Sequence, residues 1–443
     1  MTLGGTMGQR VVRVALVAGV IVLALLLLLA TCGGGGGGDA TDGKRPPPGP
    51  SASASTRKSA AAGTATRLAV PSAYANGRGW EITGASPEYA VAASAGRVGL
   101  LERVSAARFR LRTVDAAGGR TRWTGDAWQP LSDPAHFPRL LAVAKDGREF
   151  FVTWSYGKVG EDALSSADMI VALDVYDVRN GAQRRIELPW ADVPSVTGDG
   201  PGVLVSDGGA DSAVVDPVTG LVTRVAAKDL RYPKGCGGCR TQTQVRAATE
   251  KGLLVSGRRE FWVRGGWHSR TRAPGGTDAA SGVPTSVADG RVLAKWRKKR
   301  GSEGAADYDV WAVHDATSGK VLARAQCRRP AIEPGTYPRA ALSPEGRYVV
   351  AGSLGFDLET GSGHCFEEPD GTRPLSLTAV TDTGVAYGTT ATRTPVEADL
   401  TARRPTALAA NVHVPAVEVA GTGLFPWTDR KDRPRLTAYA RRG

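Results

Sequence analysis

The sequence predicts an all-β fold built from units of four antiparallel strands that repeat along most of the chain. Two observations carry this prediction. Short apolar runs joined by a glycine turn recur about every 47 residues, and a second set of turns of the form Asp-x-x-x-Gly falls between them. The 57 glycines and 27 prolines agree, because they favour short strands joined by turns over long helices.

The proportions of residue types are those of a folded protein. Hydrophobic residues make up 42% of the chain and charged residues 22%, which excludes disorder along the whole length. The formal net charge is +13, and a basic run could meet an anionic surface such as head groups, wall polymers or nucleic acid. The most basic run, residues 295–300, is interpreted as a solvated hairpin loop.

The first 32 residues predict export and attachment to the membrane. Arg10 and Arg13 precede residues 14–31, an apolar run without charge. As a helix these 18 residues would be about 27 Å long, which is enough to cross the core of a bilayer. Because flanking arginines resist translocation, everything after Thr31 is expected on the extracytoplasmic side of the cell membrane.

The end of this apolar run, LATCG at residues 29–33, resembles the lipobox of bacterial lipoproteins. The resemblance implies that Cys32 receives a diacylglycerol and becomes the new N-terminus, with Thr31 standing where Gly or Ala is usual. The alternative is an uncleaved signal anchor that remains as a transmembrane helix. Both interpretations give the same topology.

Residues 33–77 predict a disordered linker, because they are rich in Gly, Pro, Ser and Ala and cannot bury enough apolar surface to fold. The chain therefore divides into three parts. They are an anchor at residues 1–32, the linker at residues 33–77, and a folded domain at residues 78–443.

Glycine turns join the strands of the folded domain in pairs. Residues 286–294, SVADGRVLA, are typical, since they read as a strand, a tight turn and a strand. Eight such turns predict eight repeat units, with seven as the alternative. The glycines expected at the turns are Gly96, Gly147, Gly202, Gly252, Gly290, Gly346, Gly384 and Gly423.

The second series of turns begins each time with an aspartate that follows a hydrophobic strand. Aspartate can accept hydrogen bonds from the backbone amides just ahead of it, and glycine takes the positive φ that re-enters the next strand. Each copy therefore predicts a hairpin. The copies begin at Asp115, Asp177, Asp216, Asp315 and Asp357 and end at Gly119, Gly181, Gly220, Gly319 and Gly361.

Two hairpins make each unit a four-stranded sheet with apolar residues on both faces, which must stack on its neighbours. The pattern resembles the β-propeller superfamily of the WD40, TolB-like and PQQ-like type over residues 79–443, with no specific member matched. The resemblance implies four-stranded blades around a central channel.

The two ends of the domain predict how the ring closes. The last unit reaches Gly443 with one strand missing, and residues 78–82, RGWEI, are similar to the fourth strand expected at residues 120–124, RTRWT. Pairing the early strand into the last unit would leave no open edge. We therefore expect an N-terminal strand to complete the last blade.

Four cysteines follow Cys32 in the chain, and outside the cytoplasm an even set favours disulfides. Cys327 and Cys365 each follow an Asp-x-x-x-Gly turn, so they are expected on outer strands of neighbouring blades. Cys236 and Cys239 form a C-x-x-C in a loop. Three pairings are possible and the sequence leaves them open. A zinc site of four cysteines and a redox C-x-x-C are less favoured alternatives.

No motif predicts a catalytic site, a metal site or a cofactor. The five histidines are scattered over different units, without the spacing of a metal pair. Asp199, Asp289 and Asp382 lie near strand starts and could converge on a channel mouth to bind a cation or a sugar. Capping of turns is the favoured interpretation of these three carboxylates.

Two functions remain open from the sequence. The favoured one is a non-catalytic binding or scaffold module at the cell surface, with a protein or cell-wall partner and no nucleic acid. The alternative is an enzyme, either a hydrolase, a lyase or a quinoprotein-like oxidoreductase, whose site is assembled at the channel mouth from single residues of different blades. The ligand is not identified by the sequence.

Overall fold

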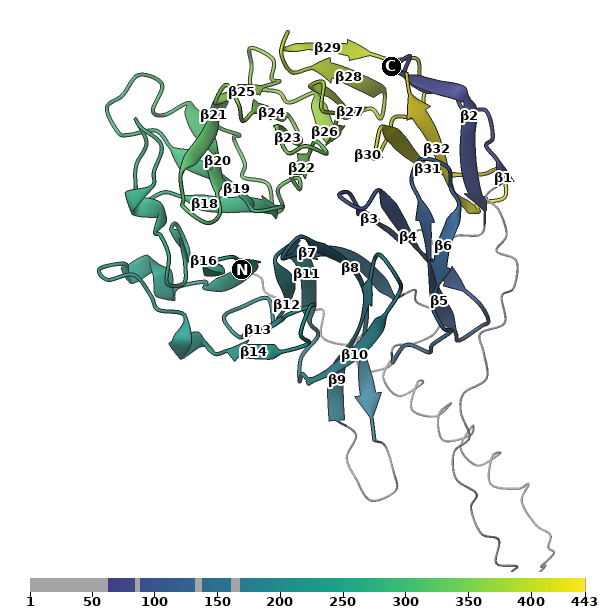
Figure 1. The fold of residues 1–443 in the computed structure, drawn as a ribbon. Coiled ribbons are helices and arrows are strands. Elements are labelled where there is room, and N and C mark those ends of the chain that lie inside the picture. The colour runs from purple at the N-terminus through teal and green to yellow at the C-terminus, as the bar shows by residue number, and fades with distance from the viewer. Residues whose placement is uncertain (1–62, 84–87, 132–137, 161–167, 443) are drawn as a thin grey trace, which may run out of the picture. The chain divides into compact units, whose positions relative to one another are not determined.

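Eight antiparallel units follow one another around a common centre in the described part of the chain (Figure 1). The structure is a computed structural model that describes residues 63–83, 88–131, 138–160 and 168–442. Apart from three short 3-10 helices, its regular elements are strands. The fold is an eight-bladed β-propeller, which confirms the predicted all-β class.

The blades follow the order of the chain, and each is antiparallel throughout. Blade 1 contains β3 (Tyr89–Ala92), β4 (Arg97–Arg103), β5 (Phe109–Asp115) and β6 (Thr121–Thr124), and blade 2 contains β7 (Arg139–Lys145), β8 (Arg148–Val159), β9 (Asp168–Asp177) and β10 (Gln183–Pro189). Blade 3 contains β11 (Ser195–Gly200), β12 (Gly202–Ser206), β13 (Ser212–Val215) and β14 (Val222–Val225), and blade 4 contains β15 (Gln244–Thr249), β16 (Gly252–Ser256) and β17 (Phe261–Val263).

Blades 5 to 8 complete the ring. Blade 5 contains β18 (Val283–Ala288), β19 (Arg291–Arg297), β20 (Tyr308–Asp315) and β21 (Val321–Arg328), and blade 6 contains β22 (Ala341–Leu342), β23 (Tyr348–Ala351), β24 (Leu354–Asp357) and β25 (Ser362–Cys365). Blade 7 contains β26 (Leu375–Val380), β27 (Val385–Thr390), β28 (Pro395–Asp399) and β29 (Arg404–Ala407), and blade 8 contains β30 (Val417–Val419), β31 (Thr422–Thr428), β32 (Pro434–Arg441), β2 (Tyr74–Thr83) and β1 (Gly63–Thr64).

The first strand of a blade lies toward the centre and the last toward the rim, as β7 and β14 show in Figure 1. Neighbouring blades are separate sheets with one exception. The outer strands of blades 5 and 6, β21 and β25, pair in parallel through Arg324 and Ser362, which joins the two blades into one sheet of eight strands.

Several details differ from the predicted repeat. The expected hinge Gly202 begins β12 and does not have positive φ. Blade 4 has three strands, because an isolated bridge between Trp262 and His268 stands where its fourth strand would lie. The first turn of blade 8 is formed by Ala420 and Gly421, both with positive φ, whereas the expected hinge Gly423 lies within β31. Positive φ is the feature a tight turn requires, so Gly421 serves as the hinge.

An apolar cluster fills each boundary between neighbouring blades, and the described residues form eight such clusters. Phe151 of blade 2, for example, packs with Leu111 of blade 1. Ile82 of blade 8 packs with Leu100 of blade 1, so the series has no open end. Burial of both faces of every sheet drives the blades together.

The N-terminal strand β2 completes blade 8 by pairing antiparallel with β32, as predicted. Trp80 lies opposite Ala438, and Ile82 lies opposite Leu436. A Cβ atom on Gly79 would come within 2.2 Å of the Ala438 carbonyl oxygen, so only glycine fits this close approach of two backbones. The ring is therefore closed by residues that are more than 350 positions apart in the sequence.

The Asp-x-x-x-Gly segments form the turns between the third and fourth strands of blades 1, 2, 3, 5 and 6. In the first copy, the side chain of Asp115 accepts a hydrogen bond of 2.7 Å from the Gly118 amide, and the Gly119 amide donates one of 2.9 Å to the Asp115 carbonyl. The closing glycines have φ between 66° and 79°. The aspartates at these turns are Asp115, Asp177, Asp216, Asp315 and Asp357.

A large side chain from the preceding blade covers several of these turns. The indole nitrogens of Trp80, Trp123 and Trp267 each donate a hydrogen bond of 2.7 to 2.9 Å to the carbonyl directly after the turn aspartate. The three indole rings lie over the closing glycines, where a Cβ atom would overlap them. This contact repeats at the boundaries 8/1, 1/2 and 4/5, so one local pattern holds successive blades together.

The boundary expected at residue 78, between linker and propeller, lies too late in the chain. Leu68 and Tyr74 are buried between blades 7 and 8, and β1 and β2 begin at Gly63 and Tyr74. The anchor predicted at residues 1–32, including Cys32 and the apolar helix, lies outside the described residues. Within the described residues, no helix has the length and apolarity to span a bilayer.

Candidate functional site

The first strands of seven blades line three hollows around the centre of the ring. Their volumes are about 160, 230 and 500 Å³. Blades 3 to 5 line the first, blades 1 to 3 the second, and blades 6 and 7 the third. Arg339 borders all three, so this one side chain connects the hollows of the central channel.

Arg339 reaches across the ring from the connection between β21 and β22. Its guanidinium donates a hydrogen bond of 2.5 Å to Asp199 in β11 of blade 3, three blades away from its own blade 6. The next residue, Ala340, is fixed by a 2.8 Å hydrogen bond from its amide to Ser286 of blade 5. Burial raises the pKa of Asp199, and Arg339 acts against that rise.

Arg246 in β15 adds a second positive charge to the wall of the same hollow as Asp199 and Arg339. Its Nε donates a hydrogen bond of 3.0 Å to Ser256. Burial lowers the pKa of Arg246, but a guanidinium keeps its charge in proteins at neutral pH. Two guanidinium groups and one carboxylate border this hollow, so its wall carries a net positive charge.

Such a wall can bind an anion or a polar group, because arginines present hydrogen-bond donors that match carboxylates and phosphates. Among the described residues that border the three hollows, Asp199 is the single carboxylate, and it is already paired. General acid–base chemistry of the two-carboxylate kind needs a second such group within reach.

The three acidic residues considered for the channel mouth are not brought together. Asp199 lies in the wall of the channel, whereas Asp289 occupies the positive-φ position of the turn between β18 and β19. The side chain of Asp382 accepts a 2.8 Å hydrogen bond from the Glu345 amide. Asp289 and Asp382 are therefore turn residues, as the favoured interpretation predicts for them.

The four cysteines of the described part form two disulfides. Cys327 on β21 and Cys365 on β25 join the outer strands of blades 5 and 6, with Cα atoms 5.6 Å apart. Cys236 and Cys239 are bonded to each other, with Cα atoms 5.4 Å apart. The two pairs belong to different blade boundaries, so the four cysteines do not gather around one zinc ion.

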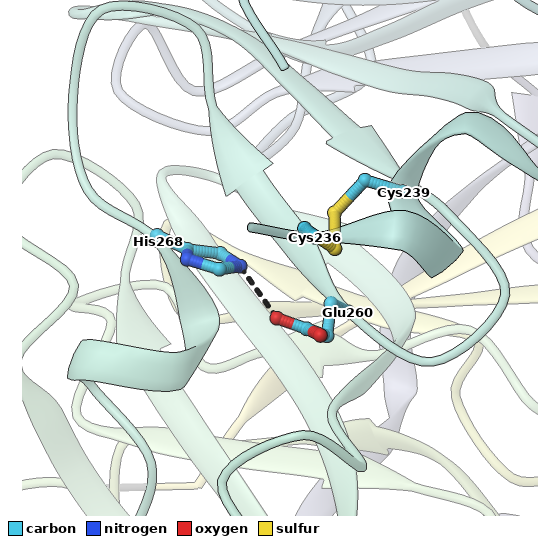
Figure 2. Close-up of side chains that lie close together, drawn as sticks. All are labelled: Cys236, Cys239, Glu260 and His268. Atoms are coloured by element: carbon cyan, nitrogen blue, oxygen red, sulfur yellow. Dashed lines mark ion pairs between the residues drawn. A yellow bond between two sulfur atoms is a disulfide. The ribbon is translucent and has the colours of Figure 1, made fainter. Parts of the chain in front are cut away.

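The Cys236–Cys239 disulfide belongs to a cluster of four side chains (Figure 2). Cys236 and Cys239 flank the start of η2 (Gly237–Arg240), in the connection between blades 3 and 4. Glu260 directly precedes β17, and His268 directly precedes η3 (Ser269–Thr271). The candidate ligand atoms of these four residues all lie within 4.8 Å of one another. We call them the Cys–Glu–His cluster.

An ion pair holds the polar half of the Cys–Glu–His cluster. His268 Nε2 lies 2.8 Å from Glu260 Oε2, and Arg270 donates hydrogen bonds of 2.6 and 3.2 Å to the same carboxylate. Burial lowers the pKa of His268, and the charge of Arg270 also lowers it, whereas Glu260 raises it. The buried carboxylate is thus balanced by Arg270 with His268 as a neutral partner.

The other described histidines have structural contacts. His314 is fully buried, stacks on Trp267 and contacts the Gly319 carbonyl at 3.1 Å. His364 packs edge-on against Phe366, and His413 against Trp427. Burial lowers the pKa of all three.

The basic run 295–300 divides into two environments. Lys295 is buried on β19, 2.5 Å from Glu333 and 3.8 Å from Asp309. Lys299 and Arg300 are exposed at the turn that follows β19. The solvated part of the run is therefore short.

Sequence reasoning pointed to Asp199, Cys236 and Cys239 but missed the residues that complete the two candidate sites. Arg339 lies in a connection without strand periodicity, so nothing in its neighbourhood points to the channel. Glu260 and His268 are separated from the cysteines by more than 20 residues and show no ligand spacing. The only signal for them is the Cys-x-x-Cys motif, which is typical of metal and redox sites but does not indicate which other residues complete the site.

The comparisons with known proteins leave the family open. No family model matches the chain, and no curated protein matches it. The crystal structure of the tricorn protease is similar at 12% sequence identity and a TM-score of 0.25, over 76% of this chain. The chain spans 43% of the length of that protein, and a likeness at this level carries no conclusion about function.

Proposed function

We propose that this protein is a membrane-tethered, extracytoplasmic β-propeller that acts as a non-catalytic binding module at the cell surface. The single observation that carries the proposal is the channel wall, in which Arg246 and Arg339 border one hollow whose single carboxylate among the described residues, Asp199, is already paired with Arg339. The repeated Asp-x-x-x-Gly turns support a relationship to propellers of the WD40, TolB-like and PQQ-like type.

The chemistry of the wall selects the class of partner. A carboxylate or phosphate of the partner can replace Asp199 on Arg339 and reach Arg246 in the same hollow, since both arginines border it. The formal net charge also favours an anionic partner, because a chain of net charge +13 attracts anionic polymers at low salt. We therefore propose an anionic cell-wall polymer as the partner.

Binding of the full chain to purified cell walls tests this proposal. We expect wild-type protein to bind at low salt, and an Arg246→Ala/Arg339→Ala variant to bind about tenfold or more weakly, because two charge-assisted contacts are lost. The matched control is Lys299→Ala/Arg300→Ala, which removes the same charge from exposed positions away from the hollows. Equal weakening by both double variants would contradict a channel site and leave only non-specific attraction.

The tether has a separate test. Replacing Cys32 by Ala removes the lipidation site of the lipoprotein interpretation but leaves the apolar run of the signal anchor. Mass spectrometry of the membrane fraction should show a diacylated N-terminus at Cys32 in the wild type, and an unprocessed chain in the variant. Recovery of wild-type chain that begins before residue 32 would establish the uncleaved anchor instead.

A further inference from the structure

The Cys–Glu–His cluster contains more than a disulfide needs. Cys236 and Cys239 are buried in the apolar cluster between blades 3 and 4, and a bond between them requires no polar neighbours. Nevertheless Glu260 is only 6% exposed, and both its carboxylate and His268 lie within 4.8 Å of the two sulfur atoms. Arg270 and His268 pair with this carboxylate, so its burial is compensated, but neither pairing requires that it lie beside two cysteines.

We propose that the reduced form of this cluster is a zinc site, in which the thiolates of Cys236 and Cys239, the imidazole of His268 and the carboxylate of Glu260 bind one ion. The set has the four N, O and S ligands that tetrahedral zinc takes, and the two cysteines have the C-x-x-C spacing common in zinc sites. Two thiolates select zinc over the hard cations calcium and magnesium.

The geometry needs small movements. With metal bonds of about 2.0 to 2.3 Å, the ligand atoms of a tetrahedral zinc site lie about 3.3 to 3.8 Å apart. The two sulfurs, which are bonded to each other in the disulfide, must separate by about 1.5 Å. The candidate ligand atoms all lie within 4.8 Å of one another, so a pair near this limit must approach by about 1 Å. Gly237 and Gly238 give the loop between the cysteines no side chain that would obstruct this rearrangement.

The backbone already holds the two halves of the cluster against each other. The Arg258 amide donates a hydrogen bond to the Gly238 carbonyl at 3.3 Å, which ties the hairpin that carries Glu260 to the cysteine loop. A Cβ atom on Gly257 would lie 2.7 Å from the Cys239 Cα, so the hairpin and the loop are in direct backbone contact. The ligands therefore come from segments that are prearranged.

The charges of the buried cluster cancel in both forms. In the disulfide form the Glu260 carboxylate is neutralised by Arg270. With zinc bound, two thiolates and one carboxylate balance the charges of the ion and Arg270. Neither form thus buries an uncompensated charge, which would be costly. Arg270 also orients the carboxylate, so it serves as a positioning residue outside the ligand set.

The conversion between the two forms balances. A dithiol reductant, either a small molecule or a dithiol protein, supplies two electrons and two protons to the Cys236–Cys239 bond and becomes a disulfide itself. Zinc then displaces both thiol protons to solvent. In the disulfide form the Nε2–H of His268 donates to Glu260 at 2.8 Å, and on zinc binding this proton moves through solvent to Nδ1, so that Nε2 can bind the metal. The connection between blades 3 and 4 is thus closed on itself by a disulfide in one state and tied to Glu260 and His268 of blade 4 through an ion in the other.

The second disulfide provides an internal control. Cys327 and Cys365 have one further candidate ligand, Glu367, and no histidine in their group. Among the described residues, these three side chains are the whole group, and a closed tetrahedral zinc site needs four ligands. Reduction of the whole protein should therefore create one zinc site per chain and not two.

Metal titration of the full chain, reduced with a phosphine and kept free of oxygen, tests the proposal. We expect one Zn²⁺ per chain, two protons released per ion, and with Co²⁺ the absorption bands of a tetrahedral site with two thiolates. Cys236→Ser/Cys239→Ser should abolish binding, whereas Cys327→Ser/Cys365→Ser should leave it unchanged. His268→Gln and Glu260→Gln should each weaken binding by about 100-fold, and Arg270→Gln by about 10- to 100-fold.

The oxidised protein should not bind zinc at all. Equal zinc affinity of the reduced wild type and Cys236→Ser/Cys239→Ser would overturn the proposal, and so would unchanged affinity in both His268→Gln and Glu260→Gln. If a variant fails to fold, the Co²⁺ spectrum of the wild type still decides, because a spectrum without thiolate bands excludes the two cysteines as ligands.

Discussion

The indole nitrogen of Trp80 donates a 2.7 Å hydrogen bond to the carbonyl oxygen of Ala116, and its ring covers Gly119. Trp80 belongs to the strand that completes the last blade, and Ala116 belongs to a turn of the first blade. One side chain thus joins the two ends of the ring, in the same way as Trp123 joins blade 1 to blade 2.

Replacement of Trp80 tests the strength of that contact. Trp80→Ala removes a side chain that is 4% exposed, and we expect the free energy of unfolding to fall by about 3 to 5 kcal/mol. Trp80→Phe keeps an aromatic ring but loses the hydrogen bond, so a smaller loss is expected. Urea denaturation measures both values. An alanine variant as stable as the wild type would show that the contact does not hold the ring.

Two glycines with the same backbone conformation separate steric overlap from backbone strain. Gly119 and Gly147 have φ of 66° and 68°, but a Cβ atom would lie 2.5 Å from the Trp80 ring at Gly119 and meet nothing within 4 Å at Gly147. We expect Gly147→Ala to cost about 1 to 2 kcal/mol of stability, from the left-handed backbone alone. Gly119→Ala should cost clearly more. Equal costs in denaturation experiments would contradict the packing of Trp80 on the turn.

The turn aspartates make stability depend on acid pH. Burial alone would raise the pKa of Asp177, but hydrogen bonds from Arg148 and the Arg179 amide hold it below its ordinary value. The same balance lowers the pKa of Asp216, Asp315 and Asp357. A carboxyl with a lower pKa in the folded chain stabilises it above pH about 4, and this contribution disappears as pH falls through the folded value.

Urea denaturation between about pH 7 and 2 measures this effect. Wild-type stability should fall below pH about 4, and Asp177→Asn should show a shallower fall because one titrating group is gone. Parallel pH profiles for the two proteins would mean that Asp177 titrates alike in the folded and unfolded chains.

The two disulfides should differ in their contribution to stability. Cys327 and Cys365 are separated by 38 positions, and Cys236 and Cys239 by 3. In the chain-entropy account, the longer loop contributes about 4 kcal/mol and the shorter about 1.5 kcal/mol. Denaturation of the oxidised double Ser variants should therefore rank Cys327→Ser/Cys365→Ser as the less stable. The reverse order would mean that tight packing around Cys236 and Cys239 outweighs the difference in loop length.

The repeat of four-stranded blades and the closure of the ring could be predicted because both depend on short, local sequence patterns. The turn aspartates and glycines mark hairpins by their own chemistry, and the RGWEI segment matches another outer strand. Irregular parts were not predictable from such patterns. Leu68 and Tyr74 lie in a segment that reads as linker, and their burial depends on blades 7 and 8, whose surfaces exist only after folding.

The candidate sites depend on contacts between distant residues. Arg339 and Asp199 are 140 positions apart, and only the ring brings them together. The Cys–Glu–His cluster brings together the connection between blades 3 and 4 and two positions at the edge of blade 4, where His268 pairs with Trp262 through an isolated bridge. Neither pairing has a spacing that a sequence pattern can reveal.

Closure of the ring by the N-terminal strand is the central claim, and equilibrium unfolding of two five-residue deletions measures it most directly. One variant lacks residues 78–82 of β2, and its control lacks residues 51–55 of the predicted linker. We predict a large loss of stability and a broadened transition for the first, because blade 8 loses its outer strand, and no change for the second. An unfolding curve of the first variant that coincides with that of the intact chain would contradict the account.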